Sequence, residues 1–281
     1  MTVFDLPAVR ALVDAALAED IARGDLTTQL TVPPDLRATA AIVAKQEGVL
    51  AGAPLVERVF AALGAHDVHI AHPVEDGATF TVGTVLVSLD GRASDLLTGE
   101  RTVLNFLQQL SGVATLTRRF VDAVRGTKAR VIDTRKTTPG LRALEKYAVR
   151  MGGGHNHRFG LDDGILIKDN HITAAGGVAA AVGAARRGAP HTARIEVECA
   201  TLEQIDEALS AGADALLLDN MAVGQIAAAV QRIAGRAVVE ASGGVSLATV
   251  WAIAETGVDL ISVGALTHSA PAIDLSMRIG A

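Results

Sequence analysis

The chain has 281 residues, of which 49% are hydrophobic and 20% charged, and its formal net charge at pH 7 is −6. The hydrophobic fraction excludes an intrinsically disordered protein, and the acidic balance argues against general nucleic-acid binding. The longest apolar stretch, around residues 174–185, is rich in glycine and too short to cross a bilayer, which argues against a membrane protein.

The first residues and the cysteine content bear on the compartment. The N-terminal region carries Asp5, Asp14, Glu19 and Asp20 and lacks the basic start and apolar core of a secretory signal. Cys199 is the single cysteine, so an internal disulfide is impossible. Disulfides are typical of secreted proteins, and we therefore expect a cytoplasmic protein.

The first part of the chain, residues 1–110, is predicted to form a separate domain with both helix and strand. Apolar residues at helical spacing predict an amphipathic helix over residues 6–21. A turn-rich stretch follows at residues 24–28. Alternating patterns then predict three strands, at residues 39–44, 68–71 and 79–88. A helix from about residue 96 to 124 is expected to lead into the next domain.

The second part, residues 111–269, has a regular alternation of strands and helices. Short aliphatic runs predict six strands, at residues 130–133, 165–167, 195–197, 215–218, 237–239 and 260–263. Helical patterns between the later strands indicate βαβ units and therefore a parallel sheet. The near-continuous apolar runs favour a sheet that is buried on both faces. We expect an incomplete (β/α) barrel, with an open doubly wound sheet as the alternative.

Polar or charged residues follow each of the six predicted strands. These groups lie at residues 133–136, 168–171, 196–198, 219–220, 240–244 and 264–268. The carboxyl ends of barrel strands meet at one mouth, where the active sites of such barrels lie. The sequence therefore predicts a functional site at this end of the sheet.

Two late loops have the composition of a phosphate site. Ser242, Gly243 and Gly244 follow a strand and precede a helix predicted at residues 247–256. Glycines let the backbone approach a phosphate closely, and free amides at a helix start bind anions. The segment from Gly264 to His268 follows the next strand, and late strand loops are where many barrels bind phosphate.

Cationic residues gather in the middle of this acidic chain. Between Arg101 and His171 there are 13 Lys/Arg residues but 6 Asp/Glu residues, which suggests a site for a small anion. The cations that come near strand ends or motifs are Arg101, Arg135, Lys136, Arg158 and Lys168, with His157 beside them. Arginine forks suit carboxylates and lysines suit phosphates. The alternative is that each cation forms a structural ion pair.

Carboxylates at the same end of the sheet have a related role. Glu198 and Asp219 could offset the repulsion among the cations, or hold a divalent metal and ribose hydroxyl groups. His155 and His157 suggest metal ligation, but no third ligand is spaced for it. Cys199 is expected to be an inert, buried strand residue and Trp251 to pack a helix.

A set of motifs in a fixed order resembles one family. The motifs are Glu100-Arg101-Thr102, Leu110-Ser111-Gly112-Val113-Ala114-Thr115, Asp133-Thr134-Arg135-Lys136-Thr137-Thr138-Pro139-Gly140, Lys146-Tyr147-Ala148-Val149-Arg150, Asn156-His157-Arg158, Lys168-Asp169-Asn170-His171, Glu196-Val197-Glu198, Leu218-Asp219-Asn220-Met221 and Ser242-Gly243-Gly244. The chain resembles the quinolinate phosphoribosyltransferases over residues 19 to 269.

The resemblance implies a fold, a reaction and an assembly. It implies an N-terminal α/β sandwich domain, with residues 270–281 packing on it, and an incomplete α/β barrel as the catalytic domain. The reaction would transfer phosphoribosyl from phosphoribosyl pyrophosphate to quinolinate with decarboxylation, giving nicotinate mononucleotide, CO₂ and pyrophosphate. The enzyme would be a homodimer in which Arg101 is donated across the interface.

The resemblance also implies roles for residues of this chain. Quinolinate would contact Arg101, Arg135, His157, Arg158 and Lys168. Phosphoribosyl pyrophosphate and its Mg²⁺ would be held by Lys136, Lys168, Glu198 and Asp219, which are the expected catalytic residues. Phosphate groups would bind Ser242, Gly243, Gly244, Gly264 and His268, and Thr134 would also contact substrate. None of these positions departs from the family pattern.

Three other functions remain open from the sequence. A related phosphoribosyltransferase could use nicotinate or another aromatic acid, or the chain could be a paralogue from molybdate gene clusters. An aldolase-like barrel could form a Schiff base at Lys168, although a lysine among charges needs a lowered pKa for that chemistry. A non-catalytic nucleotide or phosphate sensor is the third.

Overall fold

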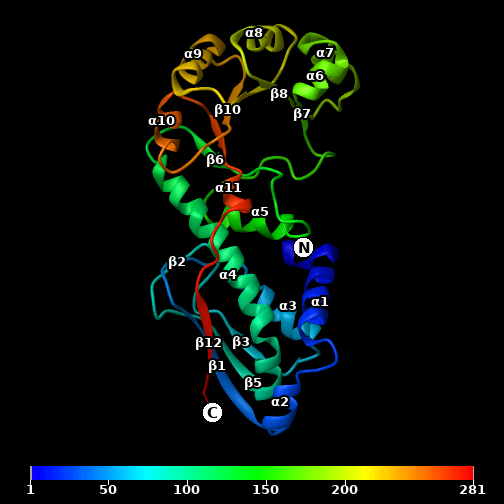
Figure 1. Ribbon diagram of the computed structural model, residues 1–281, viewed down its shortest axis with the longest axis vertical. Helices are drawn as coiled ribbons and strands as arrows, with labels where there is room; N and C mark the ends of the chain where they lie inside the picture. Colours follow the sequence, from blue (N-terminus) through cyan, green and yellow to red (C-terminus); the bar gives the residue numbers. More distant parts are fainter. Residues whose placement is uncertain (1, 281) are drawn as a thin grey trace. The chain divides into compact units, whose positions relative to one another are not determined.

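The computed structural model describes residues 2–280 and divides the chain into two compact units (Figure 1). The first, here called the N-terminal unit, comprises Met1–Arg118, Thr137–Gly153 and Leu266–Ala281, and the second, the barrel unit, comprises Arg119–Lys136 and Gly154–Ala265. Met1 and Ala281, at the ends of the expected domains, lie outside the described residues. Among residues 2–280, no helix combines the length and apolar character that crossing a membrane requires.

A four-stranded antiparallel sheet forms the framework of the N-terminal unit. Its strands, in spatial order, are β12 (Leu275–Gly280), β1 (Arg37–Ala44), β5 (Val85–Arg92) and β3 (His69–Ala71). The last strand of the chain therefore pairs with the first. A small second sheet joins β2 (Gly48–Val49) to β4 (Thr79–Phe80).

Helices complete the N-terminal unit. They are the 3₁₀ helix η1 (Val3–Asp5), α1 (Pro7–Ile21), α2 (Leu26–Thr31), α3 (Leu55–Ala62), α4 (Ala93–Ala123), α5 (Arg142–Met151) and α11 (Ala265–His268), of which α4 and α11 cross the boundaries of the unit. α1 packs against α3. Along α4, Leu96, Leu104, Leu107 and Leu110 are fully buried at helical spacing, so this face of the helix belongs to the core.

Two local predictions in this unit are wrong for identifiable reasons. The turn-rich stretch at residues 24–28 contains the start of α2, because the Asp25 side chain caps the helix by accepting a hydrogen bond from the backbone nitrogen of Thr28 at 3.0 Å. The single strand expected at residues 79–88 is interrupted between β4 and β5. Gly83 has a φ of 86° there and supplies the turn.

Six parallel strands form the sheet of the barrel unit. In spatial order they are β6 (Arg130–Ile132), β11 (Leu260–Ser262), β10 (Val238–Ser242), β9 (Ala215–Asp219), β8 (Ile195–Cys199) and β7 (Ile165–Ile167). The helices of the unit are α6 (Asp169–Ala175), α7 (Val178–Gly188), α8 (Leu202–Ser210), α9 (Val223–Ile233) and α10 (Val250–Glu255). Helices α7 to α10 form an arc outside the strands, each against the next (Figure 1). The predicted barrel-like α/β domain is therefore confirmed.

The sheet is open between its first and second strands along the chain. Among residues 2–280, no strand pairing joins β6 to β7. The segment at His155 instead lies beside β6: its backbone nitrogen donates to the carbonyl of Val131 at 2.9 Å, and its carbonyl accepts from the nitrogen of Asp133 at 3.1 Å. This pairing brings residues 155–158 to the open edge of the sheet.

The strand register separates a polar face from an apolar face. Side chains at paired positions of neighbouring strands point to the same side, and Glu198 pairs with Leu217, which pairs with Glu240. The polar side chains on this face are Glu196, Glu198, Asp219, Glu240, Ser242 and Ser262. On the opposite face Val197, Cys199 and Leu218 are fully buried. The strands were expected to be buried and apolar on both faces of the sheet. They instead carry polar side chains on one face.

Candidate active site

A lysine and a glutamate from neighbouring strands form a tight ion pair on the polar face. Lys168 follows β7, and Glu198 lies near the end of β8. The ammonium nitrogen of Lys168 donates to Oε2 of Glu198 at 2.5 Å. The Lys168 side chain remains 43% exposed and that of Glu198 15% exposed. The ammonium group can therefore reach both its partner and a bound molecule.

The next two strand ends contribute a carboxylate and a glycine loop. Oδ2 of Asp219 accepts a hydrogen bond from the side-chain amide of Asn220 at 2.8 Å, and the backbone nitrogen of Asn220 donates to the carbonyl of Ser242 at 2.9 Å. Gly243 has a φ of 94°. A Cβ atom there would clash with Oδ1 of Asn220 and lie 2.9 Å from its backbone nitrogen. Only glycine fits this turn without displacing Asn220.

The helix after this loop starts later than the sequence predicted. α10 begins at Val250 rather than at residue 247. Ser246 and Thr249 form a turn instead, in which the backbone nitrogen of Ser246 donates to Oγ1 of Thr249 at 2.9 Å. Because the side chain of Thr249 competes for the backbone in this way, the loop after Gly244 is longer than expected.

The charges of Arg135 and Arg158 lie close enough to repel each other. Nη1 of Arg158 donates to the carbonyl of Gly164 at 3.0 Å. Burial, followed by the positive charge of Arg135, lowers the pKa of Arg158, while Glu196 opposes this shift. Among residues 2–280, no carboxylate lies within ion-pair distance of Arg135. Neighbouring guanidinium groups of this kind are suited to a ligand with more than one negative charge.

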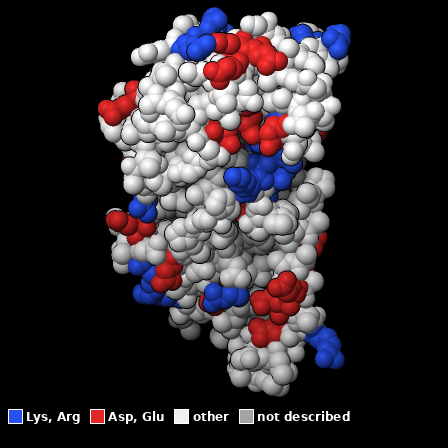
Figure 2. Space-filling view, turned by 45° about the horizontal axis from the view of Figure 1, so that its top comes forward, with Lys and Arg blue, Asp and Glu red and all other residues white. Residues whose placement is uncertain are grey.

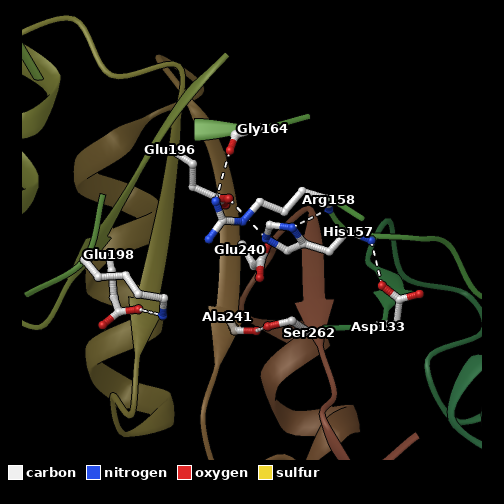
Figure 3. Close-up of polar contacts among 10 residues, drawn as sticks. Asp133, His157, Arg158, Gly164, Glu196, Glu198, Glu240, Ala241 and Ser262 are labelled. Carbon is white, nitrogen blue, oxygen red and sulfur yellow. Dashed lines mark hydrogen bonds and ion pairs between the residues drawn. The ribbon is translucent and has the colours of Figure 1, made fainter. Parts of the chain in front are cut away.

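A buried aspartate fixes the segment that carries Arg158. Asp133 is fully buried after β6. Its Oδ2 accepts a hydrogen bond from the side chain of Asn156 at 2.6 Å. Its Oδ1 accepts one from the backbone nitrogen of His157 at 2.9 Å (Figure 3). Asp133 belongs to one of the motifs in the sequence, but no function was predicted for it.

The imidazole of His157 contacts two glutamates (Figure 3). Its Nε2 lies 3.2 Å from Oε2 of Glu196 and 3.7 Å from Oε2 of Glu240. Its Nδ1 accepts a hydrogen bond from the backbone nitrogen of Arg158 at 2.6 Å. The nitrogen that accepts cannot carry the proton, so the ring proton is assigned to Nε2, which points to the carboxyl groups.

Glu240 is the most deeply buried member of this cluster. Burial, followed by the neighbouring charge of Glu196, raises the pKa of Glu240 to about 8. No third ligand was expected to accompany His155 and His157, and this is corrected for His157, which two glutamates accompany. The donor atoms of His157, Glu196 and Glu240 lie within 4.8 Å of one another. The strand alternation of Glu196 and Glu198 was the available signal, because it places both on one face.

Glu198 and Asp219 have the donor chemistry that Mg²⁺ requires. Mg²⁺ prefers oxygen ligands and is commonly held by one or two carboxylates together with substrate phosphates and water. Both residues lie at or near strand ends on the polar face, and the hydrogen bonds from Lys168 and Asn220 use Oε2 of Glu198 and Oδ2 of Asp219 rather than Oε1 and Oδ1. These two carboxylates therefore fit a magnesium ion that is shared with a phosphate-bearing substrate.

The remaining predicted site residues are divided between the two units. In the barrel unit the backbone nitrogen of Lys136 donates to Oγ1 of Thr134 at 3.0 Å. Gly264 also belongs to this unit. Arg101, exposed on α4, and His268, at the end of α11, belong to the N-terminal unit. Nδ1 of His268 lies 2.6 Å from Oγ of Ser269.

Two residues given structural roles have different outcomes. Cys199 is fully buried, and burial raises the pKa of its thiol to about 12, so the prediction of an inert residue is confirmed. Trp251 lies on α10 and is 45% exposed, and that it packs a helix stays a prediction. Acidic and basic side chains adjoin near the middle of the face drawn in Figure 2.

Two family models match the chain. "Quinolinate phosphoribosyl transferase, N-terminal domain" matches residues 25–111, and "Quinolinate phosphoribosyl transferase, C-terminal domain" matches residues 113–278. Together these models cover most of both units. The match agrees with the order of motifs found in the sequence.

Full-length relatives give the same result. The chain is 47% identical to the nicotinate-nucleotide pyrophosphorylase (carboxylating) of Mycobacterium leprae, over 98% of each chain. It is 46% identical to the probable nicotinate-nucleotide pyrophosphorylase (carboxylating) of Bacillus subtilis, over 96% of this chain and 93% of that protein. The nicotinate-nucleotide pyrophosphorylase structure from Francisella tularensis superimposes with a TM-score of 0.94 at 40% identity, covering 100% of this chain and 99% of that one. The chain therefore belongs to the quinolinate phosphoribosyl transferase family.

Proposed function

We propose that this protein transfers the phosphoribosyl group of phosphoribosyl pyrophosphate to quinolinate and releases CO₂ and pyrophosphate, giving nicotinate mononucleotide for NAD biosynthesis. One observation carries the proposal. Arg135 and Arg158, whose positive charges lie near each other, belong to the same unit as the Lys168–Glu198 pair. This placement supports a dicarboxylate site and a phosphate site on one sheet.

The arginines suit the shape of quinolinate. This substrate has two adjacent carboxylates beside a ring nitrogen, and each guanidinium group can bind one carboxylate through paired hydrogen bonds. The carbonyl of Gly164 already fixes one nitrogen of Arg158, so the side chain is oriented before the ligand arrives. Such orientation lowers the barrier for attack by the ring nitrogen, by about 7–11 kcal/mol in the best cases.

The phosphoribosyl donor would be held by the lysines and the late loops. Lys136 and Lys168 supply positive charge, and Thr134 lies beside Lys136. The turn made by Ser242, Gly243 and Gly244 offers backbone amides to a phosphate, and Gly264 and His268 are proposed as further phosphate ligands. Glu198 and Asp219 would hold Mg²⁺, which supplies charge neutralisation for the pyrophosphate group.

The first step forms one bond and breaks another. The ring nitrogen of quinolinate attacks C1 of the ribose, and the bond from C1 to the pyrophosphate oxygen breaks with its electron pair leaving on oxygen. Lys136 and Lys168 stabilise the charge that develops on this oxygen. Glu198 or Asp219 offsets the positive charge that develops at C1, as a carboxylate does in glycoside cleavage.

The second step uses the positive ring that the first step creates. The carboxylate next to the ring nitrogen leaves as CO₂, and the electron pair of the broken bond stays on the ring carbon beside the cationic nitrogen. This carbon then takes up a proton. The substrate itself stabilises the electron pair, so the chain needs no nucleophilic side chain for either step.

We further propose a homodimer in which Arg101 reaches the partner's quinolinate site. The exposed position of Arg101 on α4 supports this, since an exposed side chain can meet a second chain. Cyclic twofold dimers repeat such a contact twice, so that each protomer would receive one arginine from the other.

An assay of the purified protein tests the reaction. The protein is supplied with Mg²⁺, phosphoribosyl pyrophosphate and either quinolinate or nicotinate, and both nicotinate mononucleotide and CO₂ are followed. Product and CO₂ from quinolinate, with little product from nicotinate, are expected. Turnover of nicotinate without CO₂ would instead assign the sister activity. Binding without turnover would favour a sensor, and reductive trapping of a carbonyl compound on Lys168 would favour an aldolase-like reaction.

A further inference from the structure

Two carboxyl groups on the polar face share a single N–H group of His157. Glu196 on β8 and Glu240 on β10 both direct Oε2 at Nε2 of the imidazole, at 3.2 and 3.7 Å. The close-up in Figure 3 shows the imidazole with these carboxyl groups and the Arg158 side chain. None of the reaction steps above uses Glu196 or Glu240.

The tautomer of His157 argues against a metal centre here. A metal ion would need a lone pair on Nε2, because that is the nitrogen beside the carboxyl groups. The backbone N–H of Arg158 already points at Nδ1, so Nδ1 holds the lone pair and Nε2 holds the proton. The three groups are therefore arranged as a hydrogen-bonded cluster in which His157 is a donor.

The burial of Glu240 decides which carboxyl group is charged. Glu240 is 1% exposed, and its Oε1 is buried without a hydrogen-bond partner. A carboxylate in that position would leave a charged oxygen unsolvated, whereas a protonated carboxyl group would not. Two carboxylates that meet at one N–H also repel each other. Glu196 is less buried and faces the guanidinium group of Arg158, so the negative charge belongs on Glu196.

We infer that Glu240 is a positioning residue whose uncharged carboxyl group donates a hydrogen bond to Glu196 and so holds that carboxylate where it receives His157 and faces Arg158. The inference rests on the proposed function in one respect, since Arg158 is proposed to bind a quinolinate carboxylate. Without Glu240 the Glu196 carboxylate is no longer held in place, and Arg158 loses the charge that orients it. We therefore expect a higher KM for quinolinate and a smaller change in KM for phosphoribosyl pyrophosphate.

Two substitutions of Glu240 test whether it acts as an uncharged hydrogen-bond donor or as a charged carboxylate. Glu240→Gln keeps the shape and an uncharged donor, and should leave KM for both substrates within about twofold of the parent, as expected for an isosteric change. Glu240→Ala removes the donor and should raise KM for quinolinate about tenfold, the effect of one lost hydrogen bond to a charged group, with a smaller change for phosphoribosyl pyrophosphate. Glu255→Gln, an exposed carboxyl group on α10, is the matched control.

Specific results would overturn the inference. If Glu240→Gln raises KM for quinolinate as much as Glu240→Ala does, the charge of Glu240 matters and the neutral donor is wrong. If Glu240→Ala raises KM for both substrates equally, the residue does not act on the quinolinate side. Should Glu240→Ala fail to fold by circular dichroism, Glu196→Gln is measured instead, with the same selective rise expected for quinolinate.

A second measurement does not depend on turnover. Nitrogen-15 spectra of the histidine rings report the tautomer of His157, whose signals are identified by their loss in His157→Gln. The parent and Glu240→Gln should carry the proton on Nε2, and Glu240→Ala should shift toward a mixture. A parent with the proton on Nδ1 would overturn the inference. An inactive parent with the expected Nε2 proton would overturn the proposed function but leave the positioning intact.

Discussion

The ammonium group of Lys168, directly after β7, lies 2.5 Å from the carboxylate of Glu198 on the adjacent parallel strand β8. Ile167 pairs with Val197, so the next residue of each strand continues the same register. The pair is therefore a consequence of strand alignment. It leaves a cation held at a strand end, where a pyrophosphate group is proposed to bind.

Replacing this lysine should abolish most of the activity. Lys168→Met removes the charge proposed to stabilise the leaving pyrophosphate, and kcat/KM should fall by about 100-fold or more, the usual loss for such a group. The matched control is Lys128→Met. Lys128 forms a similar pair with Asp259 at 2.7 Å, but at the opposite ends of the strands, so its loss should leave kcat/KM near that of the parent. Equal losses in the two variants would contradict the assignment.

Arg158 should act on one substrate. Arg158→Ala should raise KM for quinolinate more than KM for phosphoribosyl pyrophosphate, by about tenfold or more for a lost charged hydrogen bond. Equal effects on both substrates in steady-state kinetics would refute the division between the arginine and lysine sites.

A glycine beside Arg158 allows a test without removing the charge. A Cβ atom at Gly164 would lie 3.1 Å from Cβ of Arg158, so Gly164→Ala should displace the side chain and raise KM for quinolinate in the same direction. Gly224→Ala, where an added Cβ meets nothing within 4 Å, is the control and should leave both KM values unchanged.

Much of the barrel unit could be predicted from the sequence. Runs of aliphatic residues gave all six strands, and their alternation with helices indicated the parallel sheet. The local sequence pattern is sufficient to predict these βα units, because each strand and the helix after it are close in the chain. α3 and α5 were not predicted, although buried residues recur at helical spacing in both, as Leu55, Val59 and Phe60 do in α3.

The site was predictable in part, for a related reason. Charges at strand ends identified Lys168, Glu198 and Asp219, because the topology alone brings strand ends together. The contact of Glu240 with His157 and Glu196 could not be predicted. It depends on the register of β8, β9 and β10 and on the backbone of Arg158, which fixes the tautomer of His157.

Gly243 should be sensitive to substitution by alanine for two separable reasons. A left-handed backbone costs an alanine about 1–2 kcal/mol, and the added Cβ would also clash with Asn220. Gly243→Ala should therefore lower the free energy of unfolding by more than this and raise KM for phosphoribosyl pyrophosphate. Gly235→Ala is the control, because its φ is 75° but an added Cβ meets nothing within 4 Å. Thermal unfolding of the two variants should differ, and equal losses would exclude the clash.

Glu240 should make the stability of the protein depend on pH in a defined direction. The pKa of Glu240 rises from an ordinary 4.5 to about 8 because of burial and Glu196, so the unfolded chain releases this proton at a lower pH than the folded chain. The free energy of unfolding therefore falls as the pH rises above about 4.5. The fall ends near pH 8, where the folded state also loses the proton. His157, Glu196 and Ser262 surround the group.

The substitution Glu240→Gln removes this titration. The variant should be more stable than the parent at neutral pH, and the difference in free energy of unfolding should grow from pH 5 to pH 8. Urea unfolding at several pH values measures it. A difference that is independent of pH would mean that Glu240 keeps an ordinary pKa in the folded chain, and Glu255→Gln should show no such trend.

The assignment of Arg101 to a partner's site predicts a specific complementation. Arg101→Ala and Lys168→Met should each be nearly inactive alone. If the two variants are mixed and their dimers exchange, half of the dimers are mixed, and each mixed dimer has one site with neither defect. About a quarter of the parent activity should therefore return, as expected for random exchange in a twofold dimer. If Arg101 served the site of its own chain, every site in a mixed dimer would carry one defect and no activity would return. Variants cross-linked within their own dimers before mixing cannot exchange and should stay inactive, which separates complementation from incomplete loss of activity in either variant.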